Sequence, residues 1–155
     1  MLKIRQRTVD IHQYINNIPA PFRDKFLERK KAYKIKFDVV NKLKSFAKDY
    51  TVVAFSAEWC KDCVANIPVL ALISELTGLE VRVFGSLKRD PLNTNRKWSI
   101  PPSPPEVETF QVNKIPYILV LNVKGEKLGE IIEGPRDGLT LEEELLKIIF
   151  DAHKV

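Results

Sequence analysis

Two cysteines, Cys60 and Cys63, lie where a short apolar strand passes into a helix, and this feature constrains the fold most. Residues 51–56 are mainly β-branched and aromatic, which predicts a buried central strand. A helix is predicted from Cys60 or the next residue to Leu76, with Gly78 as its C-terminal stop. The chain has no other cysteine. A disulfide between them would close too small a loop to stabilise a fold, so the pair requires a chemical explanation.

The remaining apolar patterns predict helices and strands in alternating order. Helices are predicted at residues 10–17, 106–111 and from Thr140 onward. Two more are predicted between Phe22 and residue 50, separated by a break near residues 33–36. Strands are predicted at residues 79–84, 117–121 and 127–132, the last two joined as a hairpin through Gly125. Pro68 should kink the helix that carries the cysteines. This order predicts an α/β sheet that ends in a hairpin.

The segment from Gly85 to Pro105 differs in composition from the rest of the chain. It contains five prolines and Trp98. It predicts an extended loop with a polyproline-like stretch at residues 99–105. Trp98 would either contact a substrate as part of a lid or pin the loop to the body of the protein.

The charge of the chain is uneven. The net charge is +5, and the first 50 residues carry 13 Lys and Arg against 5 Asp and Glu. No stacking aromatics alternate with these basic residues, so we interpret them as a solvated helix face and expect no nucleic acid partner. No apolar run is long enough to span a bilayer, and no apolar segment follows the basic residues 1–7. We therefore expect a cytoplasmic protein without a signal peptide or a membrane anchor.

The position of the cysteines predicts their chemistry. Cys60 would occupy a helix N-terminus, where unpaired backbone N–H groups and the helix dipole favour the thiolate. Because the thiolate is the nucleophile, Cys60 should attack a disulfide, and Cys63 should resolve the mixed disulfide that forms. Zinc sites use the same cysteine spacing. Zinc requires four ligands, however, and the other candidates, His12 and His153, lie at opposite ends of the chain, so no metal site is predicted.

Several segments resemble thioredoxins. Residues 53–63 (Val-Ala-Phe-Ser-Ala-Glu-Trp-Cys-Lys-Asp-Cys) and Pro68 resemble the family's active-site strand and helix. Residues 110–116 resemble its Ile-Pro segment, in which the proline is cis. Gly125-Glu126 matches the hairpin turn, and Gly134 falls near a glycine beside the substrate groove. The resemblance covers about two-thirds of the chain and implies a thioredoxin-like three-layer sandwich, a central mixed sheet with flanking helices.

The resemblance also implies roles for residues around the cysteines. Trp59 would pack beside the nucleophile and shape the rim of a groove. Pro116 would face the sulfurs and present the backbone of Ile115 to an extended substrate, because a cis X–Pro turn leaves a backbone group available to a peptide strand. Lys114 and Gly134 would complete this substrate-binding surface.

The sequence departs from the thioredoxin pattern beside the cysteines. The family's buried aspartate, six residues before the nucleophile, is replaced by Ala54. Proton transfer at the second cysteine would then use water or another carboxylate, with Glu58 and Asp62 as candidates. Lys61 and Asp62 stand between the cysteines, as in a thioredoxin-related branch with the motif Trp-Cys-x-Asp-Cys. Lys61 should lower the pKa of the first cysteine and Asp62 should raise it, so no strongly oxidising potential is expected.

We therefore predict a thioredoxin-like domain at residues 50–155, preceded by an N-terminal helical extension at residues 1–49. The helices of the extension either pack on the sheet or form a homodimer. The predicted activity is reduction of protein or small-molecule disulfides, without a cofactor and with a thioredoxin-reductase-type electron donor. The other interpretation is a non-catalytic protein-binding or redox-sensing module with the same fold.

Overall fold

The computed structural model describes residues 1–92, 97–98 and 101–153. Its helices are α1 (Leu2–Arg7), α2 (Ile11–Asn17), α3 (Ala20–Ala32), α4 (Phe37–Lys44), α5 (Lys61–Thr77), α6 (Glu106–Thr109) and α7 (Leu141–His153). Its strands are β1 (Val9–Asp10), β2 (Tyr50–Phe55), β3 (Glu80–Phe84), β4 (Tyr117–Asn122) and β5 (Lys127–Ile132).

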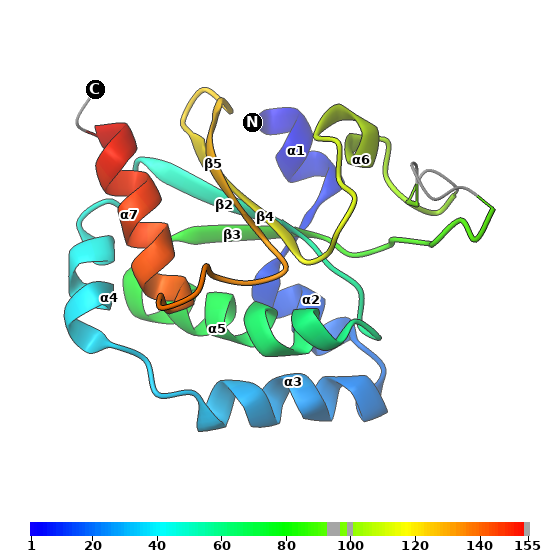
Figure 1. Cartoon of the computed structure of the whole chain (residues 1–155), viewed down its shortest axis with the longest axis horizontal. Coiled ribbons are helices and arrows are strands. Elements are labelled where there is room, and N and C mark those ends of the chain that lie inside the picture. The colour runs from blue at the N-terminus through cyan, green and yellow to red at the C-terminus, as the bar shows by residue number, and fades with distance from the viewer. Residues whose placement is uncertain (93–96, 99–100, 154–155) are drawn as a thin grey trace.

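The strands form one mixed sheet in the order β1-β3-β2-β4-β5 (Figure 1). β2 runs parallel to β3 and antiparallel to β4, and β4 and β5 form the predicted hairpin. The short strand β1 pairs antiparallel with β3 at the other edge. Every residue of β2 is buried, because this strand has neighbours on both sides and helices over both faces of the sheet.

Helices cover both faces of the sheet, as the sequence predicts. α1 and α6 lie on one face, where Arg7 pairs with Glu106 at 2.5 Å (Figure 1). α5 lies on the other face, with α3 packed along its outer side, and α7 packs against α5, β4 and β5. The fold is therefore a three-layer α/β sandwich with one additional outer helix.

α5 carries the cysteines, and its ends lie where the sequence predicts them. Cys60 is the N-cap, and Gly78 ends the helix in the left-handed conformation, at φ 80°. The Gly78 N–H donates to the Ser74 carbonyl at 2.9 Å. Pro68 lies inside the helix. α5 is apolar around most of its circumference because the sheet covers one side and α3 the other.

The predicted capping box opens α7. Thr140 Oγ1 accepts the Glu143 N–H at 3.2 Å, and the Glu143 carboxylate accepts the Thr140 N–H at 2.9 Å. The fully buried Glu142 accepts the Tyr33 hydroxyl at 2.6 Å and the Lys36 N–H at 2.9 Å. Because Lys36 is the N-cap of α4, a side chain of α7 holds the start of α4.

The N-terminal region, residues 1–49, contains α2, α3 and α4 in the predicted order, with the predicted break at residues 33–36. The sequence analysis missed α1 and β1. It also started the next helical segment at Phe22, whereas Ala20 and Pro21 already belong to α3, because proline suits the first turn of a helix. α3 and α4 pack against α5. The N-terminal region therefore forms a layer outside α5, which itself lies on the sheet.

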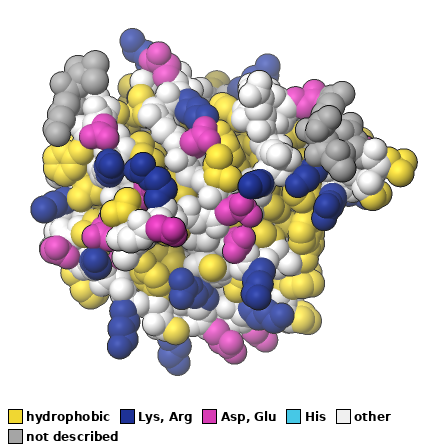
Figure 2. Space-filling view, viewed as in Figure 1, with side chains coloured by type: hydrophobic (Ala, Val, Ile, Leu, Met, Phe, Trp, Pro, Cys, Tyr) yellow, Lys and Arg dark blue, Asp and Glu magenta, His cyan; other side chains and the backbone are white. Residues whose placement is uncertain are grey.

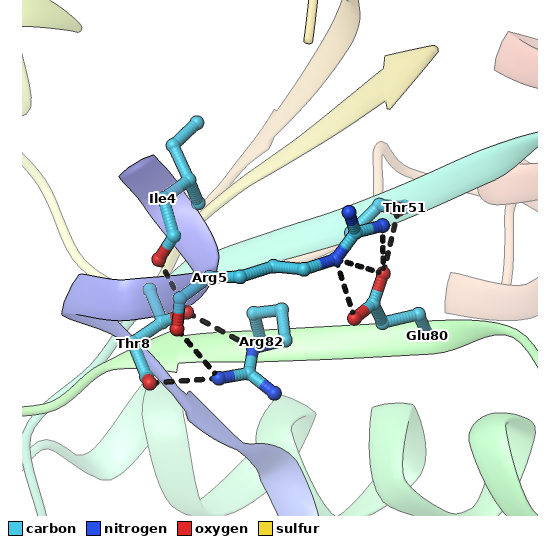
Figure 3. A network of polar contacts seen from close by, with 6 residues as sticks. All are labelled: Ile4, Arg5, Thr8, Thr51, Glu80 and Arg82. Carbon is cyan, nitrogen blue, oxygen red and sulfur yellow. Dashed lines mark hydrogen bonds and ion pairs between the residues drawn. The ribbon is translucent and has the colours of Figure 1, made fainter. Parts of the chain in front are cut away.

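A polar network attaches α1 to the sheet (Figure 3). Arg82 of β3 donates to Thr8 Oγ1 at 3.0 Å, to the Thr8 carbonyl at 2.8 Å and to the Arg5 carbonyl at 2.9 Å. Arg5 pairs with Glu80 at 2.8 Å, and Thr51 donates to the same carboxylate at 3.0 Å. These contacts fix an N-terminal helix that no local sequence pattern had indicated.

The segment from Gly85 to Pro105 is only partly as predicted. Pro101 and Pro102 form a turn with a cis peptide bond between them, which differs from an extended polyproline helix. Residues 99–100 of the expected stretch lie outside the described residues. Ser103 accepts the Lys88 N–H at 2.6 Å and donates to the Lys88 carbonyl at 3.0 Å, so it joins the two ends of the segment.

Basic side chains are spread over the surface, several of them along the lower edge in Figure 2, where α3 lies. Lys25, Lys31 and Lys34, on α3 and just after it, are all exposed. This arrangement fits the solvated helix face interpreted from the sequence. Within the part of the chain that the structure describes, no helix combines the length and the apolar character needed to cross a membrane.

Candidate active site

Cys60 lies between the end of β2 and the first turn of α5. Its backbone is extended, with φ −82° and ψ 121°, and the helix begins at the next residue. The Cys60 Sγ accepts the Cys63 N–H at 3.3 Å, and the residue is 8% exposed. The sulfur is therefore held against amides that have no partner within the helix.

The pKa of Cys60 is lowered from 9.0 to about 7. The largest cause is a hydrogen bond with the Cys63 side chain, and the backbone N–H groups of Cys63 and Asp62 act in the same direction against the effect of burial. The Asp62 charge raises the pKa, and Lys61 is not among the main causes. At neutral pH about half of the Cys60 population is therefore thiolate, the nucleophilic form.

Cys63 points inward from the first turn of α5 and is fully buried. Burial is the largest cause that raises its pKa above the ordinary value, followed by its hydrogen bond with Cys60. The Ser56 side chain and the Ala57 backbone also hydrogen-bond to the Cys63 thiol and lower its pKa in part. The two cysteines form no disulfide in this structure. The lowered pKa of Cys60 favours its thiolate, and the raised pKa of Cys63 favours its thiol.

The loop before β4 faces Cys60. The Ile115–Pro116 peptide bond is cis, as the resemblance implies. The Cys60 thiol donates to the Ile115 carbonyl at 3.7 Å, and the Pro116 carbonyl accepts the Glu133 N–H at 2.9 Å. The fold thus brings Cys60 and Ile115 together across 55 residues of sequence.

Trp59, which precedes Cys60 in the sequence, lies against Trp98. Trp59 is 52% exposed, and its ring lies 5.9 Å from that of Trp98, centroid to centroid. Trp98 is 5% exposed, and its Nε1 donates to the Asn113 carbonyl at 2.8 Å. Of the two roles open to Trp98, the structure favours pinning, because this bond ties the Gly85–Pro105 segment to the loop that precedes Pro116.

Gly134 and Lys114 lie close to residues that are linked to the cysteine helix. A Cβ added to Gly134 would lie 3.3 Å from Asn66 Nδ2. Asn66 donates to the Asp62 carbonyl at 2.8 Å and to the Glu133 carbonyl at 3.1 Å, so it links α5 to the segment after β5. Lys114 is exposed, and its Nζ lies 3.6 Å from the Glu133 carboxylate.

The carboxylates considered for proton transfer lie outside the core. Asp62 is exposed, and Glu58 is partly buried. Ala54, at the position of the family's buried aspartate, is fully buried and pairs with Val83 and Ile118 in the sheet. The hydrogen-bonding side chains at Cys63 are instead those of Cys60 and Ser56, the latter at the end of β2.

Two residues near the cysteines were missed by the sequence analysis. Ser56 is fully buried, and its Oγ lies 3.0 Å from the hydroxyl of Tyr14 in α2. The sequence did contain a signal for Ser56, because a hydroxyl directly after a mainly apolar strand is expected to be buried. A buried polar side chain requires a hydrogen-bond partner. Nothing in the sequence pointed to Tyr14, because its contact depends on how α2 packs.

The histidines lie away from the cysteines. His12 Nδ1 lies 3.9 Å from Glu75, near the far end of α5, and His153 contacts the Tyr50 hydroxyl at the start of β2. Among residues 1–92, 97–98 and 101–153, no three side chains of the types that ligate metals come together.

The chain is similar to known proteins over most of its length. A family model described as thioredoxin matches residues 8–145, and this match begins within the N-terminal region. The thiol:disulfide interchange protein TxlA homolog of Synechocystis sp. is 32% identical over 99 residues, which are 64% of this chain and 49% of that protein. The chain thus spans about half the length of this relative.

Two solved structures share the fold. A protein of unknown function from Pseudomonas aeruginosa, PA1234, has a TM-score of 0.72 and 17% identity, with 96% of each chain covered. An HIV epitope-scaffold has a TM-score of 0.73 and 17% identity, with 97% of each chain covered. At this level of identity the similarity concerns the fold alone.

Proposed function

This chain belongs to the thioredoxin family, and we propose that it is a thiol–disulfide oxidoreductase in which Cys60 attacks and Cys63 resolves. The observation that carries the proposal is the pairing of a Cys60 thiol of pKa about 7 with a buried, protonated Cys63 one turn later. The thiol:disulfide interchange protein of Synechocystis, by its name, supports the same chemistry.

In the proposed reaction, the Cys60 thiolate attacks one sulfur of a substrate disulfide and displaces the other as a thiolate. Cys63 then attacks the Cys60 sulfur of this mixed disulfide, forms the Cys60–Cys63 disulfide and releases the second substrate thiol. The protein loses two electrons, and the substrate gains two electrons and two protons. An external electron donor of the thioredoxin-reductase type would return the pair to the dithiol.

We propose reduction as the working direction. A very low nucleophile pKa, about 3.5 in strongly oxidising members of the wider fold, stabilises the dithiol and favours oxidation of substrates. The pKa of Cys60, about 7, is far from that value. A reductase requires a compartment that keeps its thiols reduced, so the cytoplasm remains the proposed location.

The proposed substrate is an extended peptide that carries a disulfide, with small-molecule disulfides as the alternative. The half-exposed ring of Trp59 supplies an apolar contact on one side of Cys60. The backbone before Pro116 also reaches the site, since the Ile115 carbonyl lies 3.7 Å from the Cys60 sulfur. Lys114 and Gly134 would border the same surface.

The two single-cysteine variants test this proposal. Wild-type protein should accelerate the reduction of insulin by dithiothreitol, and Cys60→Ser should reduce the rate to that of dithiothreitol alone. Cys63→Ser should retain the attack but not the resolution, and should therefore accumulate mixed disulfides with protein substrates on Cys60. Because the chain has no other cysteine, each variant reports on one sulfur alone.

A wild-type protein with no activity in this assay would contradict the proposal. The same holds if Cys60→Ser retains turnover, because no other thiol of that variant is accessible. Either outcome would favour the binding-module interpretation of the fold.

A further inference from the structure

The resolving step requires Cys63 to lose a proton in a place where solvent does not reach it. Cys63 is fully buried, and the strand residue next to the site, Ala54, has no group that can accept a proton. Burial of the thiol also makes its ionised form costly. Another polar group must therefore stabilise the thiolate and carry its proton away.

Ser56 is the first such group. Its side chain is fully buried and hydrogen-bonds to the Cys63 thiol in a way that favours ionisation. A hydroxyl both donates and accepts, so the hydroxyl can donate to the thiolate while it accepts a hydrogen bond from a second group. That second group is the Tyr14 hydroxyl, 3.0 Å from Ser56 Oγ.

The ring of Tyr14 is held in place by the surrounding fold. Tyr14 is 7% exposed and packs edge-on against Phe26 of α3, with ring centroids 6.4 Å apart. A Cβ at position 85 would lie 2.5 Å from Tyr14 Cε1, so the absence of a side chain at Gly85 makes room for the ring. The position of the hydroxyl is therefore determined by three segments of the chain.

Tyr14 also leads from the core to the surface. It lines an open hollow of about 210 Å³ together with Glu58, Asn17 and Ser86. The charge of Glu58 acts on the Tyr14 hydroxyl. The residue at the end of the hydroxyl chain thus lines a hollow whose walls are partly apolar and also carry the Glu58 carboxylate and the Arg7 guanidinium.

We propose that Ser56 and Tyr14 form a two-hydroxyl relay that stabilises the Cys63 thiolate and passes its proton to solvent at the Glu58 hollow. The proposal rests on the proposed exchange function. Ser56 acts directly on the ionisation of Cys63, whereas Tyr14 lies 3.0 Å from Ser56, acts through it and is a positioning residue. In thioredoxins a buried aspartate at the position of Ala54 would accept the proton. Here Ser56, just after β2, and Tyr14, in α2, would take over that role.

The step balances in atoms and electrons. Cys63 gives its proton to Ser56, Ser56 gives its own to Tyr14, and Tyr14 gives its own to water in the hollow. The Cys63 sulfur then forms a bond to Cys60 Sγ, and the bond between Cys60 and the substrate sulfur breaks. The departing substrate thiolate takes up one proton from solvent, and both hydroxyls regain their original state.

The titratable neighbours of the relay come from three segments. Cys60 acts on Cys63 from the start of α5, and Tyr14 approaches from α2. Glu58, in the loop before α5, acts on Tyr14, and Asp62 acts on Cys60. A pH profile of the resolving step must be compared with that of the attacking step, since Cys60 influences both.

A chromogenic disulfide, dithiobis(nitrobenzoate), separates the two steps. The reduced full-length protein releases a first thionitrobenzoate when Cys60 attacks, at a rate that depends on reagent concentration. It releases a second when Cys63 resolves, at a rate that does not. The variants are Ser56→Ala and Tyr14→Phe, and the matched control is Tyr33→Phe, which removes a tyrosine hydroxyl bonded to Glu142 instead.

We expect Ser56→Ala to slow the second phase about tenfold and Tyr14→Phe about threefold, as for loss of a hydrogen bond to a charged group. The pH midpoint of the second phase should rise in both variants, while the first phase stays within about twofold of wild type. Tyr33→Phe should change neither phase.

Second phases that keep their wild-type rates and midpoints in both variants would overturn the relay. Equal slowing at every pH, with no shift of the midpoint, would also overturn it, because a purely structural role predicts that result. Failure of the wild type to release a second thionitrobenzoate would overturn the proposed exchange function and the relay with it. If the wild type releases the second thionitrobenzoate normally and the variants do not behave as expected, the relay is overturned and the proposed exchange function is not.

Discussion

The parts of the molecule before and after Tyr50 are held together in different ways. After Tyr50, long apolar elements pair with one another, and β2, β4 and α5 bury most of their residues. Before it, helices of mixed polarity bury single apolar side chains such as Ile11, Phe26 and Leu43 in the same core, and individual polar contacts add to this packing. Arg82 binds the end of α1, Glu142 binds the start of α4, and Tyr14 of α2 binds Ser56.

The reactive residues and the residues that hold them in place therefore come from different parts of the chain. The cysteines and the cis-proline loop belong to the apolar body, whose elements can be read from local patterns. The N-terminal region adds no sulfur and no loop to the site, yet its Tyr14 reaches the residue next to Cys63. The reactivity of Cys60 should therefore depend only on the part of the chain after Tyr50. The stability of the fold and the rate at which Cys63 resolves the mixed disulfide should depend on both parts.

The largest expected effect concerns the contrast between the two thiols. Alkylation of reduced protein by iodoacetamide should modify Cys60 with a pH midpoint near 7, because the alkylation rate follows the thiolate fraction. Cys63 should react at least about 100-fold more slowly, because it is buried and protonated. Mass spectrometry of the alkylated wild-type protein checks this after trypsin digestion, because cleavage after Lys61 separates the two cysteines. A Cys60 midpoint near 9.0, the ordinary value, would contradict it.

The next effect concerns the attachment of α4. Glu142→Ala should lower the free energy of unfolding by about 2–4 kcal/mol, because it leaves the half-buried Tyr33 hydroxyl and the Lys36 N–H without their acceptor. Urea denaturation measures the change, with the exposed Glu28→Ala on α3 as the control. A loss below about 0.5 kcal/mol would mean that the N-terminal region does not depend on this contact.

A smaller loss of stability is expected at the glycine beside Tyr14. Gly85→Ala should cost about 1–3 kcal/mol, because its Cβ would overlap the ring of Tyr14. The exposed Ser86→Ala is the neighbouring control. In a Tyr14→Ala background the cost of Gly85→Ala should fall, and additive costs in this double-mutant cycle would refute the steric explanation.

The smallest effect concerns the exposed pair that attaches α1. Arg5 holds the pKa of Glu80 below its ordinary value, chiefly through their hydrogen bond. A lowered carboxylate pKa stabilises the fold above pH 4.5 and loses this contribution as the pH falls through the lowered pKa. Arg5→Gln should therefore cost about 0.5 kcal/mol at pH 7, and less at acidic pH, because solvent screens the pair. An equal difference at pH 7 and pH 3 would argue against the ion pair.

Most of the body after Tyr50 could be predicted from the sequence. The strands, the ends of α5, the capping box of α7 and the hairpin follow from periodicity, a left-handed glycine and short-range hydrogen bonds. The cysteine chemistry could be inferred from residues 60–63 because a helix N-terminus is a local feature. The prediction of a polyproline-like stretch was wrong at Pro101 and Pro102, which form a turn with a cis peptide bond between them.

The sequence by itself therefore determined the elements of the sheet, the position of the dithiol at a helix N-terminus and the family that these features imply. The tertiary structure decided which residues surround Cys63. Ser56 and Tyr14 meet only because α2 packs against α5 and β3 and Gly85 makes room for the ring. Such contacts join residues 42 positions apart through single hydrogen bonds, and a single hydrogen bond leaves no periodic trace in a sequence.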